Sequence, residues 1–432
     1  MTEMKDSGVA WINTIPKKWK LKKIKYALKN RNENNNPIRS KNILSLTAKQ
    51  GVIPLEEKEG GGNKPKEDYS AYKLAYPNDI VMNSMNVLSG SVGLSKYFGC
   101  VSPVYYMLRP IDEKDDVRYY NYIFQTTVFQ RSLLGLGNGI LMKESDNGKL
   151  NTIRMRIPLD KLGNLLIPVP DSSIQRKIAD YLDSIIPNID MLLADIEKQI
   201  ETLEEYKKSI ITEAVTKGLD PDVEMQDSGI EWMGMVPSTW ESNKVLNCID
   251  FIGGSQPPLS YFEGEEKEGY VRLIQNRDYK TDDYMTFVPK RMVTKFCEVD
   301  DVMIGRYGPP LFVLHRGLKG AYNVAIMKAV PKLLDREFMA FYLQNYTLLQ
   351  YIESFSKRTA GQAGVNTDIL KKYPIYVPPM EEQKEIAIYL EKKCIEIDNV
   401  IGKKKEQLET LDQYKKSLVY EYVTGKKEVP DA

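Results

Sequence analysis

The clearest pattern in the chain is a helical stripe of apolar residues that occurs twice. Between residues 171 and 217, apolar side chains recur at steps of three and four, which is the spacing of one face of an α-helix. They are Ile189, Leu192, Ile196, Ile200, Leu203, Tyr206 and Ile210. Residues 397–424 repeat the stripe with Ile397, Ile401, Leu408, Leu411, Tyr414 and Leu418, and Lys404 interrupts it. We expect Pro187 to break or restart the first helix and Gly218 to end it.

Each helix needs a partner against which it can bury so narrow an apolar stripe. Its spacing is close to a heptad seam, and each helix is about 40 Å long at about 1.5 Å per residue. The favoured arrangement is an antiparallel coiled coil made by the two helices. The alternative is that each helix packs on its own globular module.

The chain contains two copies of one arrangement of segments. Residues 171–216 align without gaps on residues 379–424, and 18 of the 46 positions are identical. Near the start of each copy, the Asp-Ser-Gly at 6–8 recurs at 227–229, and Trp19 recurs as Trp240. The segments between these matches are barely similar. Identity in one part beside divergence in another indicates one framework that serves two different targets.

The divergent segments read as mixed α/β modules. Short β-prone runs are separated by glycine and proline, and residues 119–134 and 336–355 have helical apolar spacing. The sequence therefore predicts an α+β, or mixed, fold with a pseudo-two-fold internal repeat, in which two α/β domains are separated by two long antiparallel helices. The expected divisions are 1–170 for the first module, 171–217 for a central helical spacer, 218–378 for the second module with 218–236 as a connector, and 379–432 for a C-terminal helical spacer and tail.

The connector resembles the C-terminal tail joined to the N-terminal head. Val-Thr with a lysine and a glycine occurs at 215–218 and again at 423–426, and an Asp-Ser-Gly opens each module. Joining the C-terminus to the N-terminus would thus give a second connector like the first. The two termini are therefore expected to lie close together.

Composition restricts the possible functions. The formal net charge of the 432 residues is only +1, so a nucleic-acid site would need local positive charge. Four cysteines far apart argue against a disulfide framework and a structural zinc site: Cys100, Cys248, Cys297 and Cys394. The N-terminus has no apolar signal core, and no apolar run approaches membrane-spanning length. The expected location is the cytoplasm.

Catalytic motifs are missing from the sequence. There is no phosphate-binding loop of the GxxxxGK[ST] kind, no Asn/Asp-Pro-Pro-Tyr/Phe of DNA amino-methyltransferases, and no nuclease motif of spaced carboxylates and lysine. The single histidine, His315, is expected to have a core or DNA-facing role rather than a catalytic one. The chain is therefore expected not to be an enzyme by itself.

DNA recognition needs cations for phosphates and Arg, Lys, Asn or Gln side chains for base edges. Candidate DNA-binding residues are Asn83, Asn86, Asn138, Lys143 and Arg154 in the first module, and Gln275, Arg277, Arg306, Tyr307, Arg316, Arg358 and Gln362 in the second. Candidate spacer or partner-binding residues on the repeated helices are Ile196, Leu203, Tyr206, Lys208, Leu411, Tyr414 and Lys416. A basic run at 17–31 is either phosphate-facing or a solvated face.

Several motifs together match a known family. They are Ile15-Pro16 with Trp19, Val236-Pro237 with Trp240, Pro170 with Gln175 and Ile178, Pro378-Pro379 with Gln383 and Ile386, Gly305-Arg306-Tyr307-Gly308, and Ala363-Gly364-Val365-Asn366. With these motifs, the chain resembles Type I restriction–modification specificity subunits over essentially its full length. Met380 and the run at 171–174 differ from the Pro-Pro-Leu-Glu-Glu-Gln motif that is usual in the family.

The resemblance implies a non-catalytic DNA-binding subunit. Each module would be a target-recognition domain that reads half of a bipartite site in double-stranded DNA, and the helices would set the unread spacer. Two methyltransferase subunits and restriction subunits are the implied partners, with no membrane. No cofactor is expected in this chain, because S-adenosylmethionine, ATP and Mg are expected in the partners, which methylate adenine and cleave foreign DNA.

Two other functions stay open from the sequence. A duplicated adaptor with a coiled-coil spacer would show no salt-dependent DNA binding. A restriction–modification enzyme with unrecognised catalytic residues would transfer methyl groups by itself.

Overall fold

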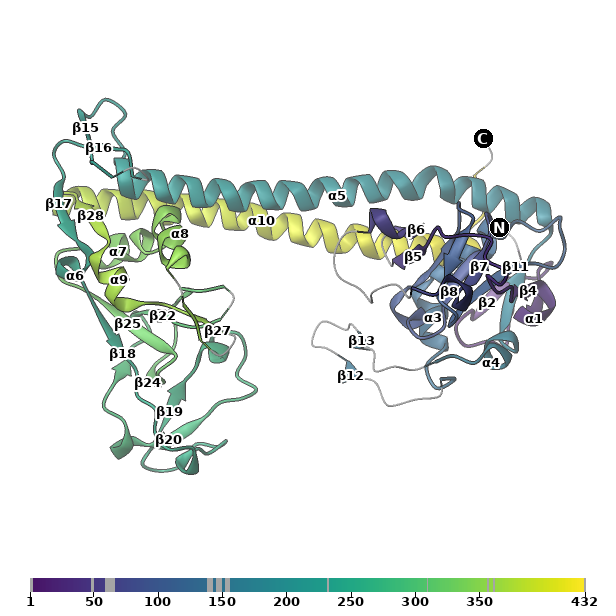
Figure 1. Ribbon diagram of the computed structural model, residues 1–432, viewed down its shortest axis with the longest axis horizontal. Helices are drawn as coiled ribbons and strands as arrows, with labels where there is room; N and C mark the ends of the chain where they lie inside the picture. Colours follow the sequence, from purple (N-terminus) through teal and green to yellow (C-terminus); the bar gives the residue numbers. More distant parts are fainter. Residues whose placement is uncertain are drawn as a thin grey trace. The chain divides into compact units, whose positions relative to one another are not determined.

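The computed structural model describes residues 3–47, 50–58, 67–137, 143–144, 150–151, 156–230, 233–308, 310–355, 357–359 and 362–430. The chain forms two compact units. Unit 1 comprises Met1–Ile196 and Glu406–Ala432, and unit 2 comprises Glu197–Lys405. Each unit holds one divergent module and a stretch of both long helices, α5 (Ser172–Lys217) and α10 (Met380–Val423) (Figure 1).

The module of unit 1 is built on a four-stranded antiparallel sheet in the order β4 (Leu28–Arg31), β11 (Tyr105–Pro110), β8 (Ile80–Asn83), β9 (Val92–Leu94). Helix α2 (Val117–Gln125) packs on β9, and α3 (Thr127–Ser132) follows it. Other elements are β1 (Met4–Asp6), β2 (Thr14–Pro16), β3 (Lys20–Lys23), α1 (Ile24–Ala27), β5 (Leu44–Thr47), β6 (Gly51–Pro54), β7 (Lys73–Ala75), β10 (Gly99–Val101), β12 (Lys143–Glu144), β13 (Leu150–Asn151), α4 (Leu159–Gly163) and β14 (Leu166–Val169).

The module of unit 2 repeats this sheet in the order β18 (Ile249–Gly253), β25 (Ile326–Pro331), β22 (Val302–Gly305), β23 (Leu314–His315). It adds a second four-stranded sheet, β20 (Phe287–Pro289), β19 (Tyr270–Ile274), β24 (Gly320–Tyr322), β21 (Phe296–Cys297), in which β19 and β24 are parallel. Other elements are β15 (Met225–Asp227), β16 (Met235–Pro237), β17 (Glu241–Lys244), α6 (Val245–Cys248), α7 (Arg336–Tyr342), α8 (Tyr346–Ser354), β26 (Lys357–Thr359), β27 (Gln362–Gly364), α9 (Thr367–Lys372) and β28 (Pro374–Val377).

The two stretches with helical apolar spacing each form two helices rather than one. Thr126 ends α2 and caps α3 by accepting a hydrogen bond from the Phe129 amide. Asn345 does the same for α8, accepting from the amides of Thr347 and Leu348. Apolar spacing alone does not reveal these breaks, because an N-cap residue satisfies the amides that a continuous helix would bond internally.

The long helices pair in antiparallel fashion within each unit, as the stripe predicts. In unit 2, Lys207 Nζ binds the Asp398 carboxylate at 2.6 Å, while Lys404 Nζ donates to the Gln199 side chain. In unit 1, Lys415 binds Asp190. Because 190 and 207 are equivalent to 398 and 415 in the repeat, both units make the same ion pair from opposite helices. The alternative arrangement also holds in part, since the start of α5 and the end of α10 enter the core of module 1.

The seam between the helices is narrower than the sequence stripe. Ile210, Ile397 and Ile401 form its core in unit 2, with Ile200 and Leu203 packed against them. Leu192 and Tyr206, which the stripe includes, are 53% and 54% exposed. The predicted stripe is therefore wider than the seam, because a two-helix pair buries only the residues that face the partner.

Pro187 does not break α5, contrary to expectation. The helix continues from Ser172 to Lys217 with the proline inside it. Leu182 and Ile189 on either side are buried in the module 1 core. This packing offsets the lost backbone hydrogen bond and the clash, which cost about 3 kcal/mol. Gly218 follows the helix end with a φ of +77°, as expected.

A buried glutamine anchors the first turn of each long helix. The Gln175 side chain accepts from the Asp116 amide at 3.1 Å and donates to the Asp115 carboxylate and the Pro170 carbonyl, both at 2.9 Å. The Gln383 side chain accepts from the Asp335 amide at 2.7 Å and donates to the Pro378 carbonyl at 2.9 Å. Asp116 and Asp335 are the N-caps of α2 and α7, so each module is tied to its helix through a helix cap.

A second repeated contact joins each module to the far end of the other helix. Gly218, after α5, lies against Trp240 of unit 2, and a Cβ there would be 3.4 Å from the indole. Gly425, after α10, lies against Trp19 of unit 1, where a Cβ would be 2.9 Å from the ring. Both glycines also have positive φ, so the helix end and the tryptophan contact require glycine together.

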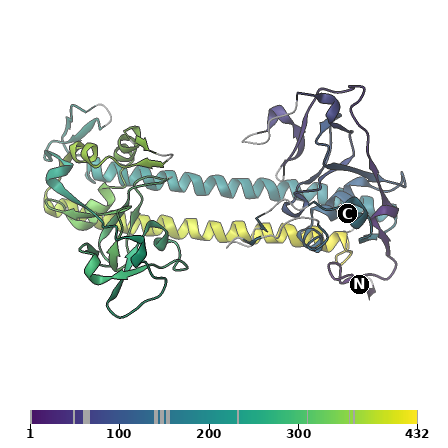
Figure 2. The ribbon, with the colours of Figure 1, turned by 60° about the horizontal axis from the view of Figure 1, so that its bottom comes forward.

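The two terminal segments of the chain lie together in unit 1, as the sequence predicts (Figure 2). The Tyr420 hydroxyl donates to the Ile12 carbonyl at 3.0 Å. Lys426 Nζ donates to the carbonyls of Ile12 and Thr14. The end of α10 is thereby fixed to the start of module 1.

His315 is half-buried in module 2. Its imidazole stacks on the Tyr279 ring, with centroids 4.3 Å apart and planes 9° from parallel. Burial, and secondarily the charge of Lys280, lowers its pKa below the ordinary value. The ring therefore acts as a neutral packing group rather than a charged one.

Replacing Gln383 with leucine should destabilise unit 2 strongly. The Asp335 amide and the Pro378 carbonyl would each lose a partner, at about 1–3 kcal/mol per buried group. Gln413→Leu, on the exposed face of the same helix, is the matched control and should change stability by less than about 0.5 kcal/mol. Urea unfolding followed by circular dichroism measures both, and equal unfolding midpoints for the two variants would contradict the anchor role.

Stability should fall with acid because of His315. Its folded pKa lies below the unfolded value of about 6.5, so its contribution is complete above that pH and is lost as pH drops through it. His315→Phe removes the only imidazole in the chain. Thermal melting at pH 7 and pH 5 should show a smaller drop for the variant, and parallel drops would refute the prediction.

Candidate nucleic-acid interface

Module 1 contains a polar cavity of about 510 Å³ with two cations in its lining. Lys73 on β7 and Arg156 line it, together with Asn30, Asn32 and Tyr106. Burial lowers the pKa of Lys73 below its ordinary value, and the charge of Arg156 lowers it further. Among the described residues neither cation forms an ion pair, although Asp160 stands in the same lining. Unpaired cations beside amides suit a phosphate oxygen or a base edge.

The candidate asparagines of module 1 form a turn next to its central sheet. Asn83 ends β8, and its side chain accepts from the Met85 amide at 3.0 Å. Asn86 is exposed. Asn138 and Arg154 lie outside the described residues, as does the side chain of Lys143 on β12. The structure thus places two of the five predicted residues side by side and leaves the other three as predictions.

Module 2 gathers polar atoms without partners around the end of β22. Within the described part of the chain, Ser255 Oγ, Asn276 Oδ1 and Arg306 Nε are buried and have no hydrogen-bond partner. The Asn276 amide crowds Gly305, where a Cβ would lie 3.0 Å from its oxygen. A buried polar group left without a partner costs about 1–3 kcal/mol, so each of these atoms needs a partner such as water or a ligand.

Arg306 presents its guanidinium beside an exposed aromatic ring. It lies 5.7 Å from the centre of the Tyr307 ring, and Nη1 donates to the Val324 carbonyl at 3.3 Å. Tyr307 is 42% exposed and bridges to Gly364, where a Cβ would meet its ring at 3.0 Å. A fork of donors held against an aromatic face is the geometry that reads guanine or stacks on bases.

Other predicted residues of module 2 are spread over this region. Gln275 bonds Thr286 Oγ1 at 3.1 Å, and exposed Arg277 donates to the Tyr284 carbonyl at 3.3 Å. The guanidinium of Arg316 is ion-paired with Glu337 at 2.7 Å, which reduces its availability to DNA. Arg358 and Gln362 stand on the hairpin β26–β27, which approaches Tyr307, but their side chains are outside the described part.

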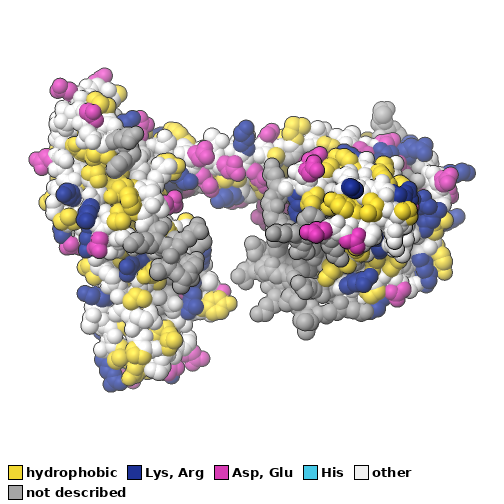
Figure 3. All heavy atoms as spheres, viewed as in Figure 1, with side chains coloured by type: hydrophobic (Ala, Val, Ile, Leu, Met, Phe, Trp, Pro, Cys, Tyr) yellow, Lys and Arg dark blue, Asp and Glu magenta, His cyan; other side chains and the backbone are white. Residues whose placement is uncertain are grey.

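Charge on the surface is mixed rather than uniformly basic. Figure 3 shows lysine and arginine side chains interspersed with acidic ones on each unit. The seven lysines between 17 and 31 are all exposed, and in the described residues only Lys17 has an acidic partner, Glu3. Arg31 instead binds Asp79 at 3.1 Å and covers the Tyr76 ring. Positive charge is therefore local, as the net charge requires.

The predicted partner-binding residues fall into two groups on the helices. Leu203 and Leu411 pack in the helix pair, and Ile196 is half-buried, which suits a spacer role. Tyr206 and Tyr414, at equivalent positions, are 54% and 50% exposed, and Lys208 and Lys416 are exposed beside them. The two copies of the repeat therefore present the same aromatic and basic side chains to solvent.

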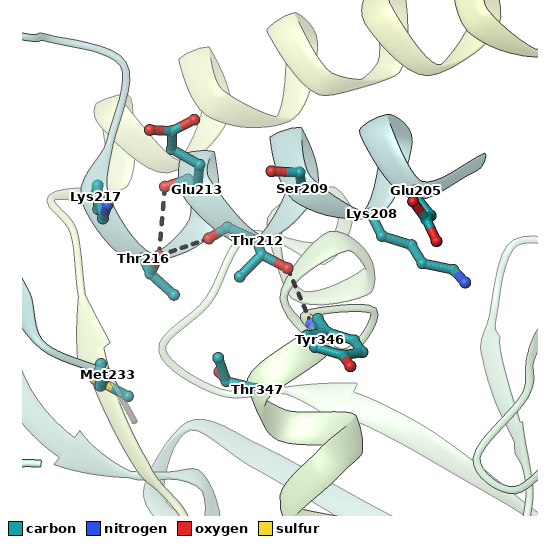
Figure 4. Close-up of a pocket in the computed structure, with 10 residues that line it drawn as sticks. All are labelled: Glu205, Lys208, Ser209, Thr212, Glu213, Thr216, Lys217, Met233, Tyr346 and Thr347. Atoms are coloured by element: carbon teal, nitrogen blue, oxygen red, sulfur yellow. Dashed lines mark hydrogen bonds between the residues drawn. The ribbon is translucent and has the colours of Figure 1, made fainter. Parts of the chain in front are cut away.

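Lys208 also lines a groove of about 630 Å³ between α5 and α8 (Figure 4). The Thr212 hydroxyl accepts from the Tyr346 amide at 3.0 Å there, and Thr216 and Met233 complete the wall. The groove thus joins the repeated helix surface to the α8 end of module 2.

Sequence reasoning missed Asn30, Asn32, Lys73 and Ser255 as site residues, and did not select Asn276. Asn30 and Asn32 stand two apart at a strand end, a spacing that puts two amides on one face. That signal was available. Lys73 meets Arg156 only through the fold, so no local pattern could have paired them.

Comparison with known proteins agrees with the resemblance. The family described as Type I restriction modification DNA specificity domain matches residues 300–410. The Type I restriction enzyme MjaVIII specificity subunit of Methanocaldococcus jannaschii is 26% identical over 284 residues, covering 61% of this chain and 62% of that subunit. The Type I restriction enzyme EcoBI specificity subunit of Escherichia coli is 24% identical over 271 residues, covering 55% and 53%. The chain thus spans about three fifths of the length of the first relative and about half of the second.

A solved structure supports the fold. Described as the structural basis underlying complex assembly and conformational transition of the type I R-M system, it has a TM-score of 0.69 and 14% identity, covering 96% of this chain and 99% of the other. Within the described ranges, none of the helices is both long and apolar enough to span a bilayer. In sequence the chain is thus similar to type I restriction enzyme specificity subunits, and in fold to a structure of the type I R-M system.

Proposed function

We propose that this chain is the non-catalytic DNA-recognition subunit of a type I restriction–modification complex. Each module reads one half of a bipartite site in double-stranded DNA. The subunit directs adenine methylation and restriction by partner subunits, and it works in the cytoplasm.

One observation carries this proposal: the same contacts hold the long helices to both modules, although the modules themselves differ. The glutamine anchor, the Trp–Gly contact and the Asp–Lys ion pair each occur once per unit. The modules share one four-stranded sheet, but unit 2 adds a second sheet of four strands. Two different modules held by the same helical framework suit the recognition of two different half-sites.

The chemistry of each module supports contact with DNA. Unit 1 offers Lys73, Arg156 and two asparagines around one cavity, and unit 2 offers Arg306 against Tyr307 with orphaned polar atoms nearby. Arginine and asparagine are the side chains that bind base edges in pairs of hydrogen bonds.

The exposed repeated surface of the helices supports protein partners. Tyr206 and Lys208, with Tyr414 and Lys416, form the same patch twice, which suits two copies of one methyltransferase subunit. Restriction subunits would join them. S-adenosylmethionine, ATP and Mg would be held by those partners, and this chain would hold no cofactor.

Methylation mapping tests the proposed function directly. The chain is co-expressed with its neighbouring methyltransferase subunit, and methylated adenines are located across the genome. We expect one bipartite motif, of which only one half changes when residues 1–170 are replaced by those of a relative. A stable complex that yields no methylation would favour the adaptor function instead.

A substitution at Arg306 tests the reading role of module 2. Arg306→Lys keeps the charge but loses the donor fork, so one base position should relax by about 1–3 kcal/mol of discrimination while salt dependence is retained. Arg316→Lys is the matched control, because its guanidinium is engaged by Glu337. The measurement is the methylated DNA motif of each variant, mapped across the genome. If Arg306→Lys methylates the same motif as the original chain, that residue does not read a base.

A further inference from the structure

The two copies of the helix framework differ at one buried aromatic position. In unit 1, Tyr422 is fully buried, and its ring lies 4.7 Å from that of Tyr181. The repeat places Ala214 at the position of Tyr422 and Tyr389 at that of Tyr181. Unit 2 therefore keeps one tyrosine of the pair and lacks the other.

A cavity of about 480 Å³ lies beside the tyrosine that unit 2 retains. Its apolar lining comes from Ile210, Ala214, Leu219, Pro221, Met225 and Tyr389. Tyr389 is 38% exposed, so solvent reaches its ring. The cavity borders the same Ala214 and Tyr389 that stand where the stacked pair fills unit 1.

The rim of this cavity carries unbalanced acidic charge. Glu213 and Asp220 are exposed in its lining, with Lys217 as the one cation. Gly218 and Gly425 follow the two helices at matching places, and after them unit 1 has Lys426 and Lys427 where unit 2 has Leu219 and Asp220. Lys427 Nζ lies 5.9 Å from the Tyr422 ring centre. Unit 1 thus supplies from its own chain a second aromatic ring with a lysine over it, whereas unit 2 has Ala214 and Asp220 at these two places.

We propose that the cavity beside Ala214 and Tyr389 receives a tyrosine side chain with a neighbouring basic residue from the methyltransferase subunit that docks on the helices. The chain's own second copy shows that a tyrosine fits this place, and the acidic rim complements the basic neighbour. The two docking sites are consequently unequal, because only the one on unit 2 gains a buried anchor. This inference rests on the proposed function and adds to it the chemistry of one partner contact.

Filling the cavity tests the inference. Ala214→Tyr gives unit 2 the residue that unit 1 already has, and Ala194→Tyr, at an exposed position of the same helix, is the matched control. Titration with the methyltransferase subunit, with native mass spectrometry of the complexes, should show affinity lost at one of two sites by about thirty-fold in Ala214→Tyr, as for removal of a buried aromatic anchor. The control should bind two copies as the original chain does, and equal binding by Ala214→Tyr would overturn the inference.

A small probe separates the cavity from the complex. The phenol 4-methylphenol, which is the tyrosine side chain alone, should perturb the resonances of Ala214 and Tyr389 in the isolated chain and leave Ala214→Tyr unaffected. If Ala214→Tyr melts below the original chain, Ala214→Leu serves as the second filling variant. Absence of any phenol site would overturn the inference, whereas failure of the original chain to bind methyltransferase or support methylation would overturn the proposed function instead.

Discussion

The fold depends on a buried glutamine at the start of each long helix. Gln175 and Gln383 each bond an amide at the cap of a module helix and the carbonyl of a proline just before the long helix. An amide side chain can donate and accept at once, so a single residue fixes the direction of the helix relative to its module. Burial makes loss of these bonds costly, and it explains why the same side chain stands at both positions while the modules around it have diverged.

Once the helices are fixed at their starts, the modules can vary at their far edges. The central sheet of each module stays in contact with the helix anchor through α2 or α7. The second sheet of unit 2 has one small core of its own and shares another with the central sheet. Polar atoms without partners gather at that periphery, around Ser255, Asn276 and Arg306. Stability and recognition are thereby assigned to different parts of the chain, and substitutions at the edge leave the frame intact.

The repeat explains how much could be predicted from the sequence. Residues that do the same work twice stand out by identity, so the helices, their antiparallel pairing and the meeting of the termini followed from Gln175, Tyr206 and their copies. The errors at Pro187 and Leu192 arose where packing overrides a local rule. The candidate site was less accessible, because Lys73 and Arg156 converge only through the fold, and no pattern distinguishes Arg306 beside Tyr307 from Arg316 beside Glu337.

The places where the repeat is broken follow from chain connectivity. In unit 1, Ile12 and Tyr420 are 408 residues apart, so noncovalent contacts hold the helix end to the module, among them those of Tyr420 and Lys426. In unit 2, a short connector joins α5 to β16 covalently. Less chain entropy is therefore lost when these two segments meet, and noncovalent contacts have less to offset. Thr212 and Ala214 can therefore stand where unit 1 has Tyr420 and Tyr422 without loss of the junction. The space that these smaller residues leave is available to another molecule only on unit 2, so a framework copied within one chain still presents two unlike surfaces.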